Sequence, residues 1–209
     1  MLHRLQALID HRVIATDGET GTVQDFLFDD KTWVIHYLVV DVSRWLSRRE
    51  VVLPVSAVER LDWEKKTLHV PLTKEQVRES PDVDTKEPVS RQQEIAMREY
   101  FGRLAYWVDR KSPMTSSMPT GIEYPVHTKG DLHLRSVSHL EGYEVWGTDG
   151  DIGRLEGFVL DEAPWHLAYL DVKGGEWLLG RSVLIPTRWA KSISWANHRV
   201  NLHHTRKGV

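Results

Sequence analysis

The chain has 209 residues, a net charge of −3 at pH 7 and no cysteine. The missing cysteine excludes disulfides, thiolate metal sites and a cysteine nucleophile, and it is consistent with a reducing compartment. Basic and acidic groups nearly balance in residues 1–77 (10 and 12), 78–139 (9 and 9) and 140–209 (8 and 9), which argues against a phosphate-tracking surface and so against nucleic-acid binding.

No run of 18 apolar residues occurs, so the sequence predicts no membrane-spanning helix. The first six residues do not resemble a signal peptide, because no long apolar run follows their charge. We therefore expect a soluble, cytoplasmic protein.

The first third of the chain has the pattern of short β-strands separated by turns. Its strands are rich in β-branched and aromatic residues, and an Asp-Gly pair at 17–18 favours a tight turn. The strand at 33–42 is apolar on both faces, so it should be central in its sheet. About six antiparallel strands close most simply into a small barrel. In chain order the predicted strands cover residues 13–15, 22–28, 33–42, 50–53, 58–62 and 67–70.

A connector follows the strands. Residues 73–76 and 90–93 have helix-capping patterns, and the second opens one short helix at about 91–101. Its apolar residues are loosely amphipathic. Residues 112–121 have the composition of a loop.

The last third repeats the first at an offset of 132 residues, without a gap from about residue 11 to residue 77. Such a repeat predicts two copies of one small fold. We place the first copy at 1–77, the connector at 78–139 and the second copy at 140–209. Domains this small bury a limited fraction of their surface, so we expect the copies to pack on each other or on a second chain. Matching pairs include Gly18 and Gly150, Gly21 and Gly153, Asp29 and Asp161, Trp33 and Trp165, Pro54 and Pro186, and Trp63 and Trp195.

No catalytic, cofactor-binding or metal-binding constellation is predicted. His203 and His204 are adjacent, so on a strand they point to opposite faces and cannot easily share a metal. The mid-strand His36 aligns with Ala168, which argues against a catalytic histidine common to both copies. The glycines at 18–21 lie between two strands, where a dinucleotide fingerprint needs a strand and a helix. The acidic residues at 17, 29 and 41 could be read as an acid cluster, but those at 17 and 29 are interpreted as turn-forming.

Two clusters have the composition of binding hot spots, in which tryptophan, tyrosine and arginine are enriched. One is the loop at 44–49 and the other lies in the connector at 100–107. The favoured interpretation is structural: the tryptophans at 45 and 177 cover barrel ends, and the connector aromatics staple its helix to the barrels. Otherwise the connector aromatics form an exposed apolar patch for dimerisation. The candidate binding residues are Arg44, Trp45, Arg48, Arg49, Tyr100, Phe101, Tyr106 and Trp107.

Three segments of the first copy resemble the PRC-barrel family: 17–26 (DGETGTVQDF), 33–41 (WVIHYLVVD) and 51–54 (VVLP). Residues 149–153 and 165–172 match in the second copy. The connector, with PVSRQQE at 88–94, is similar to the link in bacterial tandem PRC-barrel proteins. The resemblance implies a mainly β protein with two small antiparallel barrels joined by a connector with one short helix.

The family's known roles imply docking: the reaction-centre H subunit caps a membrane complex, and a ribosome maturation factor domain contacts a ribosomal protein. We therefore expect a non-enzymatic interaction module that binds an unidentified protein partner, possibly as a homo-oligomer, without a cofactor. The alternatives are a ribosome- or RNA-associated assembly factor with contacts from Arg44, Arg48 and Arg49, a peripheral cap on a membrane complex, and a hydrolase or metal enzyme.

Overall fold

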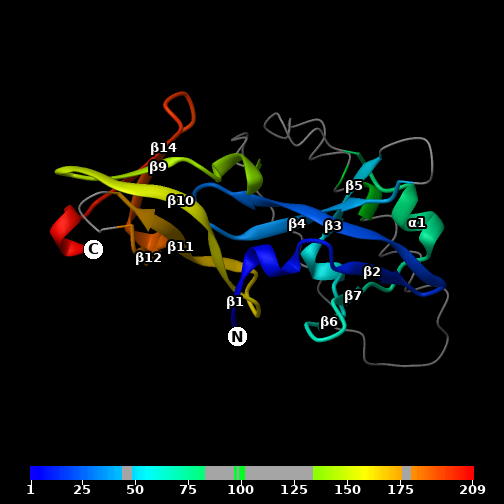
Figure 1. Cartoon of the computed structure of the whole chain (residues 1–209). Helices are drawn as coiled ribbons and strands as arrows, with labels where there is room; N and C mark the ends of the chain where they lie inside the picture. The colour runs from blue at the N-terminus through cyan, green and yellow to red at the C-terminus, as the bar shows by residue number, and fades with distance from the viewer. Residues whose placement is uncertain (44–48, 83–96, 98, 102–133, 176–179) are drawn as a thin grey trace. The chain divides into compact units, whose positions relative to one another are not determined.

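The structure is a computed structural model, and it describes residues 1–43, 49–82, 97, 99–101, 134–175 and 180–209 (Figure 1). The described residues form two separate sheets and only short helices, which confirms the predicted mainly β class. Closure of each sheet into a barrel stays a prediction.

The first sheet contains the strands of the first copy in the order β5-β4-β3-β2-β7-β6. Strand β4 lies inside the sheet, as its two apolar faces predicted. The pairs β2–β3, β4–β5 and β6–β7 are antiparallel, whereas β2 and β7 run parallel. The strand bounds are β2 Arg12–Ala15, β3 Gly18–Asp29, β4 Ile35–Asp41, β5 Glu50–Pro54, β6 Arg60–Asp62 and β7 Thr67–His69.

The second sheet has the corresponding order β12-β11-β10-β9-β14-β13. Again one pair, β14 with β9, is parallel. The strand bounds are β9 Glu144–Gly147, β10 Gly150–Asp161, β11 His166–Gly174, β12 Ser182–Pro186, β13 Ala190–Ser194 and β14 Arg199–Leu202.

The 132-residue offset recurs in the strand register. Tyr37 lies opposite Pro54 in the β4–β5 pair, and Tyr169 lies opposite Pro186 in the β11–β12 pair. Left-handed backbone recurs as well, in pairs of positions that the offset relates: 10 and 142, 18 and 150, 33 and 165, and 66 and 198. The two copies therefore share their backbone conformation down to individual turns.

Two three-residue strands were missed by the sequence pattern. β1 (Leu2–Arg4) precedes the first copy but pairs with β10 of the second sheet, with Leu2 opposite Asp161. β8 (Leu134–Ser136) precedes the second copy but pairs with β3 of the first sheet. The two strands are related by the same 132-residue offset, so the copies exchange equivalent strands. The local pattern gives no sign that these segments pair with the sheet of the other copy.

This exchange is reflected in the two compact units of the chain. The first unit comprises Met1–Ile9, Asp25–His36 and Arg135–Val209, and the second comprises Asp10–Gln24 and Tyr37–Leu134. Both units are thus assembled from segments that are distant in the sequence. The boundaries near residues 77 and 140 describe where each copy begins and ends along the chain, and they stay a prediction.

The predicted strand at 33–42 begins later than expected, at Ile35. Trp33 has a φ of 61° and belongs to the preceding turn, where its amide donates to the Asp29 carbonyl oxygen at 2.8 Å. Left-handed backbone is a genuine outlier for a bulky residue. The buried Trp33 ring stacks on Phe28 at 5.5 Å, and this packing offsets the backbone strain.

The capping pattern at 73–76 is confirmed. Helix α1 (Lys74–Arg78) begins after Thr73, whose side chain accepts a hydrogen bond from the Gln76 amide, while the Gln76 side chain accepts one from the Thr73 amide. In the predicted helix at 91–101, the described residues 97 and 99–101 are helical. The remaining helices are single 3₁₀ turns: η1 Leu5–Leu8, η2 Val55–Ala57, η3 Ser138–Leu140, η5 Thr187–Trp189 and η6 Arg206–Gly208.

Candidate docking surface

Three of the candidate binding residues lie within the described residues: Arg49, Tyr100 and Phe101. Arg49 is exposed just before β5, and its amide donates to the Ser43 side chain at 3.0 Å. The other candidates lie outside the described residues: Arg44, Trp45, Arg48, Tyr106 and Trp107.

Tyr100 and Phe101 pack inward in the second unit. Phe101 is buried, and the Tyr100 hydroxyl donates to the carbonyl oxygen of Gln76 in helix α1 at 2.5 Å. Their rings contact each other edge to face at 5.2 Å. This placement supports the stapling interpretation for these two residues, and their part in binding stays a prediction.

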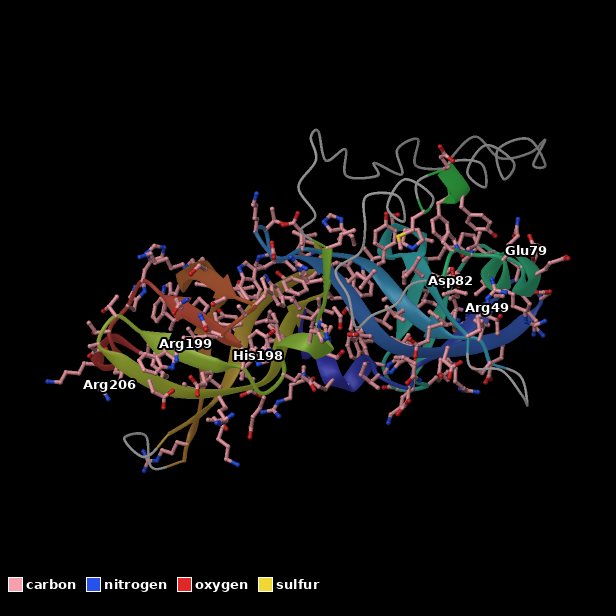
Figure 2. The ribbon with its side chains drawn as sticks, turned by 90° about the horizontal axis from the view of Figure 1, so that it is seen from above. Arg49, Glu79, Asp82, His198, Arg199 and Arg206 are labelled. Atoms are coloured by element: carbon pink, nitrogen blue, oxygen red, sulfur yellow. The ribbon has the colours of Figure 1, made fainter. Side chains whose placement is uncertain are left out.

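The outer edge of β5 is covered by the start of the connector. The Val52 amide donates to the Pro81 carbonyl oxygen at 3.0 Å, and Val51 forms an antiparallel bridge with Asp82. Ser80, just before this segment, is fully buried. Figure 2 labels Arg49 and Asp82 in the same region of the view. Residues 81–82, which include the acidic Asp82, therefore pair with the edge strand of the first copy.

The corresponding edge in the second copy is exposed. β12 stands at the end of its sheet, beside β11 (Figure 1). Leu184, the counterpart of Val52, is 54% exposed, whereas Val52 is 0% exposed. Arg181 and Arg188 are exposed at the two ends of β12. The copies thus differ in how this equivalent edge is covered.

A buried carboxylate in the first unit holds the exchanged strand β8 and helix η3. Asp25 is 6% exposed, and it accepts hydrogen bonds from the amides of Phe26 and Ser138 and from the hydroxyls of Ser136 and Ser138. Its counterpart is Gly157, where an added Cβ would lie 2.3 Å from the Gln6 side chain. The carboxylate is fully engaged in structure, so it is a poor candidate for acid–base chemistry.

Each exchanged strand also places a basic side chain near a carboxylate at an equivalent position. His3 lies 3.5 Å from Glu162, and Arg135 lies 3.5 Å from Asp30, between nitrogen and carboxylate oxygen. The Trp195 indole donates to the same Asp30 carboxylate at 3.2 Å. Both pairs attach a strand to a turn of the opposite copy, which indicates a structural purpose.

Tyr143 packs edge to face on Trp195 at 5.9 Å. Burial raises the pKa of the Tyr143 hydroxyl, and the nearby charge of Arg135 partly opposes this. The hydroxyl is therefore kept neutral at physiological pH and is not prepared to act as a base.

On the surface of the second copy, Glu144 accepts hydrogen bonds from the Arg199 guanidinium at 3.1 Å and the Trp146 indole at 3.0 Å. The Arg199 guanidinium stacks over the Trp146 ring at 3.9 Å. The hydrogen bond from Arg199, and then that from Trp146, lowers the pKa of the Glu144 carboxyl. Figure 2 labels Arg199 beside His198 on this face. Glu144, Trp146 and Arg199 therefore form one connected cluster on the surface of the second copy.

The turn interpretation, made for Asp17 and Asp29, is confirmed by local hydrogen bonds at Asp29. Asp29 accepts from the amides at 31 and 32, and Asp41 accepts from Ser43. Asp17 instead accepts from the distant Lys74 amide at 2.8 Å. Its counterpart Asp149 accepts from the Arg206 amide at 2.7 Å, the equivalent position. This pair of aspartates therefore ties the segment after the last strand to the first turn.

His204 stacks on Trp189 at 4.0 Å, while His203 is exposed, as expected for structural or solvent-exposed histidines. Among the described residues, no group of three metal-ligating side chains is brought together. In the same part of the chain, no helix is long and apolar enough to cross a membrane.

Comparison with curated proteins found no match. The PRC-barrel domain family matches residues 2–77 and 133–203, which include both sets of strands and most of the chain. The resemblance seen in the sequence is thereby confirmed, and the chain belongs to the PRC-barrel domain family, with the domain present twice in tandem.

Proposed function

We propose that this protein is a non-enzymatic docking module, in which two PRC-barrel domains present surfaces to another protein. The observation that carries the proposal is that buried polar side chains form hydrogen bonds with other groups of the same chain. Asp25 and Asp29 accept hydrogen bonds from the chain's own amides and hydroxyls, and the buried Thr187 hydroxyl donates to the Leu167 carbonyl oxygen at 2.7 Å. Such groups hold segments together and leave no reactive pair among the described residues.

The surfaces support the same proposal. The framework is repeated in register, whereas the edge of β12 and the cluster at Glu144 and Arg199 have no equivalent in the first copy. Fold alone does not determine function, and differences between copies of one fold are where separate binding properties arise. The two copies therefore offer different surfaces to partners.

Affinity capture from the native cell lysate tests this proposal. The tagged full chain should retain a protein partner that the purified chain then binds saturably in calorimetry. A variant with Arg44→Ala, Arg48→Ala and Arg49→Ala, run in parallel, tests whether the loop at 44–49 makes the contact. Loss of the partner in the variant places the contact in this loop, and retention moves it elsewhere. A metabolite turned over by the wild type, with turnover abolished by a single substitution, would overturn the docking function.

A further inference from the structure

The strand ladders of the two copies show which backbone groups of β12 face outward. The Val42 amide donates to the Arg49 carbonyl oxygen at 3.0 Å, and the Gly174 amide donates to the Arg181 carbonyl oxygen at 2.9 Å. Hydrogen-bonded pairs alternate with non-bonded pairs along an antiparallel ladder. Counting along each ladder from these bonds, the residue at position 52 or 184 occupies a non-bonded pair, so its amide and carbonyl face away from the neighbouring strand.

In the first copy these outward groups are used. Val52 donates to Pro81, and the bridge between Val51 and Asp82 continues the pairing. In the second copy, no carbonyl among the described residues accepts a hydrogen bond from the Leu184 amide. An edge strand with outward amides is a template for pairing with another chain.

The side chains along β12 show the same difference. The first copy buries residues 51–54 of β5, whereas in β12 only Ile185 is buried. Leu184 contributes apolar surface at the centre of the strand, and Arg181 and Arg188 lie at its two ends. None of the carboxylates in the described part of the chain forms an ion pair with either arginine. The edge therefore combines an apolar centre with positive ends.

We propose that β12 pairs with an extended acidic segment of a partner protein, as β5 pairs with residues 81–82 of its own connector. The proposal rests on the docking function proposed above. Arg181 corresponds to Arg49 by the repeat, and the residue that bridges to β5 in the first copy is the acidic Asp82. Backbone hydrogen bonds provide the affinity of such strand addition, and side chains provide its specificity. The first copy thus provides the example for the backbone pairing, and the positive ends of β12 favour acidic residues in the partner segment.

The probe is a synthetic peptide with the sequence of residues 79–85, added to the isotope-labelled full chain and followed by NMR. We expect saturable shifts at the amides of Ser182 and Leu184 and slower hydrogen exchange at Leu184. A peptide with both aspartates replaced by lysine should bind about tenfold more weakly, because it then repels Arg181 and Arg188.

Two substitutions test the site. Leu184→Pro removes the outward amide but leaves the β11 ladder intact, since edge strands accept proline where the amide faces outward. Leu184→Asp keeps the amide and places a negative charge opposite the acidic peptide. Each should weaken peptide binding about tenfold, the proline because one backbone hydrogen bond is lost and the aspartate because it repels the acidic peptide. Lys207→Ala, an exposed change at the C-terminal turn η6, is the control and should leave binding unchanged.

Several outcomes would overturn the proposal: no saturable shift at millimolar peptide, shifts centred on Val52 in place of Leu184, or binding that neither Leu184 variant weakens. Sedimentation that shows the chain self-associating through β12 would also overturn it, because a second copy would then be the occupant. If both Leu184 variants still capture a partner from the lysate, β12 is not the docking surface, whereas the proposed docking function still holds.

Discussion

At the scale of residues, the two copies place different side chains at equivalent positions of a common backbone. Asp25 aligns with Gly157, and Val52 aligns with Leu184. The first copy has the buried Asp25 carboxylate at the first of these positions. The second copy has Gly157, and the Gln6 side chain lies where a side chain at Gly157 would begin. Differences at single positions therefore decide which parts of each copy are held internally and which are left exposed.

Replacing Asp25 by alanine should lower the free energy of unfolding by about 3 kcal/mol, because it leaves the buried donors of Ser136 and Ser138 without their acceptor. Urea denaturation followed by tryptophan fluorescence measures the change. The exposed Asp151→Ala is the control, and it should change stability by no more than about 0.5 kcal/mol. Equal effects of the two substitutions would contradict the structural role of Asp25.

The pKa of Glu144 should rise toward its ordinary value in Arg199→Gln, because the hydrogen bond from Arg199 is the main cause of its lowered pKa. Carbon-detected NMR titration of the carboxyl measures this. Trp146→Phe should raise the pKa by less. The pKa of Asp62, lowered mainly by the Lys65 amide, should stay unchanged in both variants.

The free energy of unfolding should depend on pH for the same reason. Folding lowers the pKa of Glu144, so the ionised form stabilises the fold above the pKa of the unfolded chain, and this contribution is lost as the pH falls through the folded-state pKa. Arg199→Gln should therefore lose less stability than the wild type on acidification. An identical acid dependence would contradict this account.

At the scale of elements, the glycines at bulges of the long strands are required by close backbone approach. An added Cβ at Gly153 would lie 2.0 Å from the Lys173 carbonyl oxygen, and at Gly21 it would lie 2.3 Å from the Asp41 carbonyl oxygen. Both glycines adjoin register shifts in their strand pairs. The 132-residue repeat predicted a glycine at this position in both copies. The close approach of the neighbouring backbone explains why a glycine is needed there.

Gly153→Ala should destabilise the protein by about 2 kcal/mol, since backbone atoms cannot move aside without disturbing the ladder. Thermal or urea unfolding measures the effect. Gly157→Ala is the matched control on the same strand, because its new Cβ would meet only the flexible end of the Gln6 side chain. That control should cost less than about 1 kcal/mol, and a larger cost than that of Gly153→Ala would refute the argument.

At the scale of the whole molecule, the exchanged strands make the copies interdependent. β1 completes the second sheet and β8 the first, so a fragment that ends after one copy lacks a strand of its own sheet and carries a strand of the other. The first compact unit contains both chain termini and the middle segment Asp25–His36. Cooperative folding of the full chain follows from this arrangement.

Fragments 1–82 and 134–209, expressed together, should therefore purify as one complex, with each supplying a strand to the other. Size-exclusion chromatography of a tagged pair measures this. Removal of residues 1–9 from the first fragment should weaken the complex, because it deletes β1 and the His3–Glu162 pair. Independent, equally stable fragments would show that the exchange contributes nothing to stability.

The sequence by itself determined the repeat, the mainly β class, the family and most strand positions. These follow from local information: alternation, turn residues such as Gly18 and the capping box at Thr73 are encoded within a few neighbours. Only the tertiary structure decided that β1 and β8 are exchanged, that Asp25 is buried under Ser136 and Ser138, and that Leu184 lies on an open edge while Val52 is covered. The strand exchange and the burial of Asp25 depend on contacts between segments more than a hundred residues apart. The difference between Leu184 and Val52 depends on whether another segment pairs with the edge strand. No local pattern of residue types encodes such contacts.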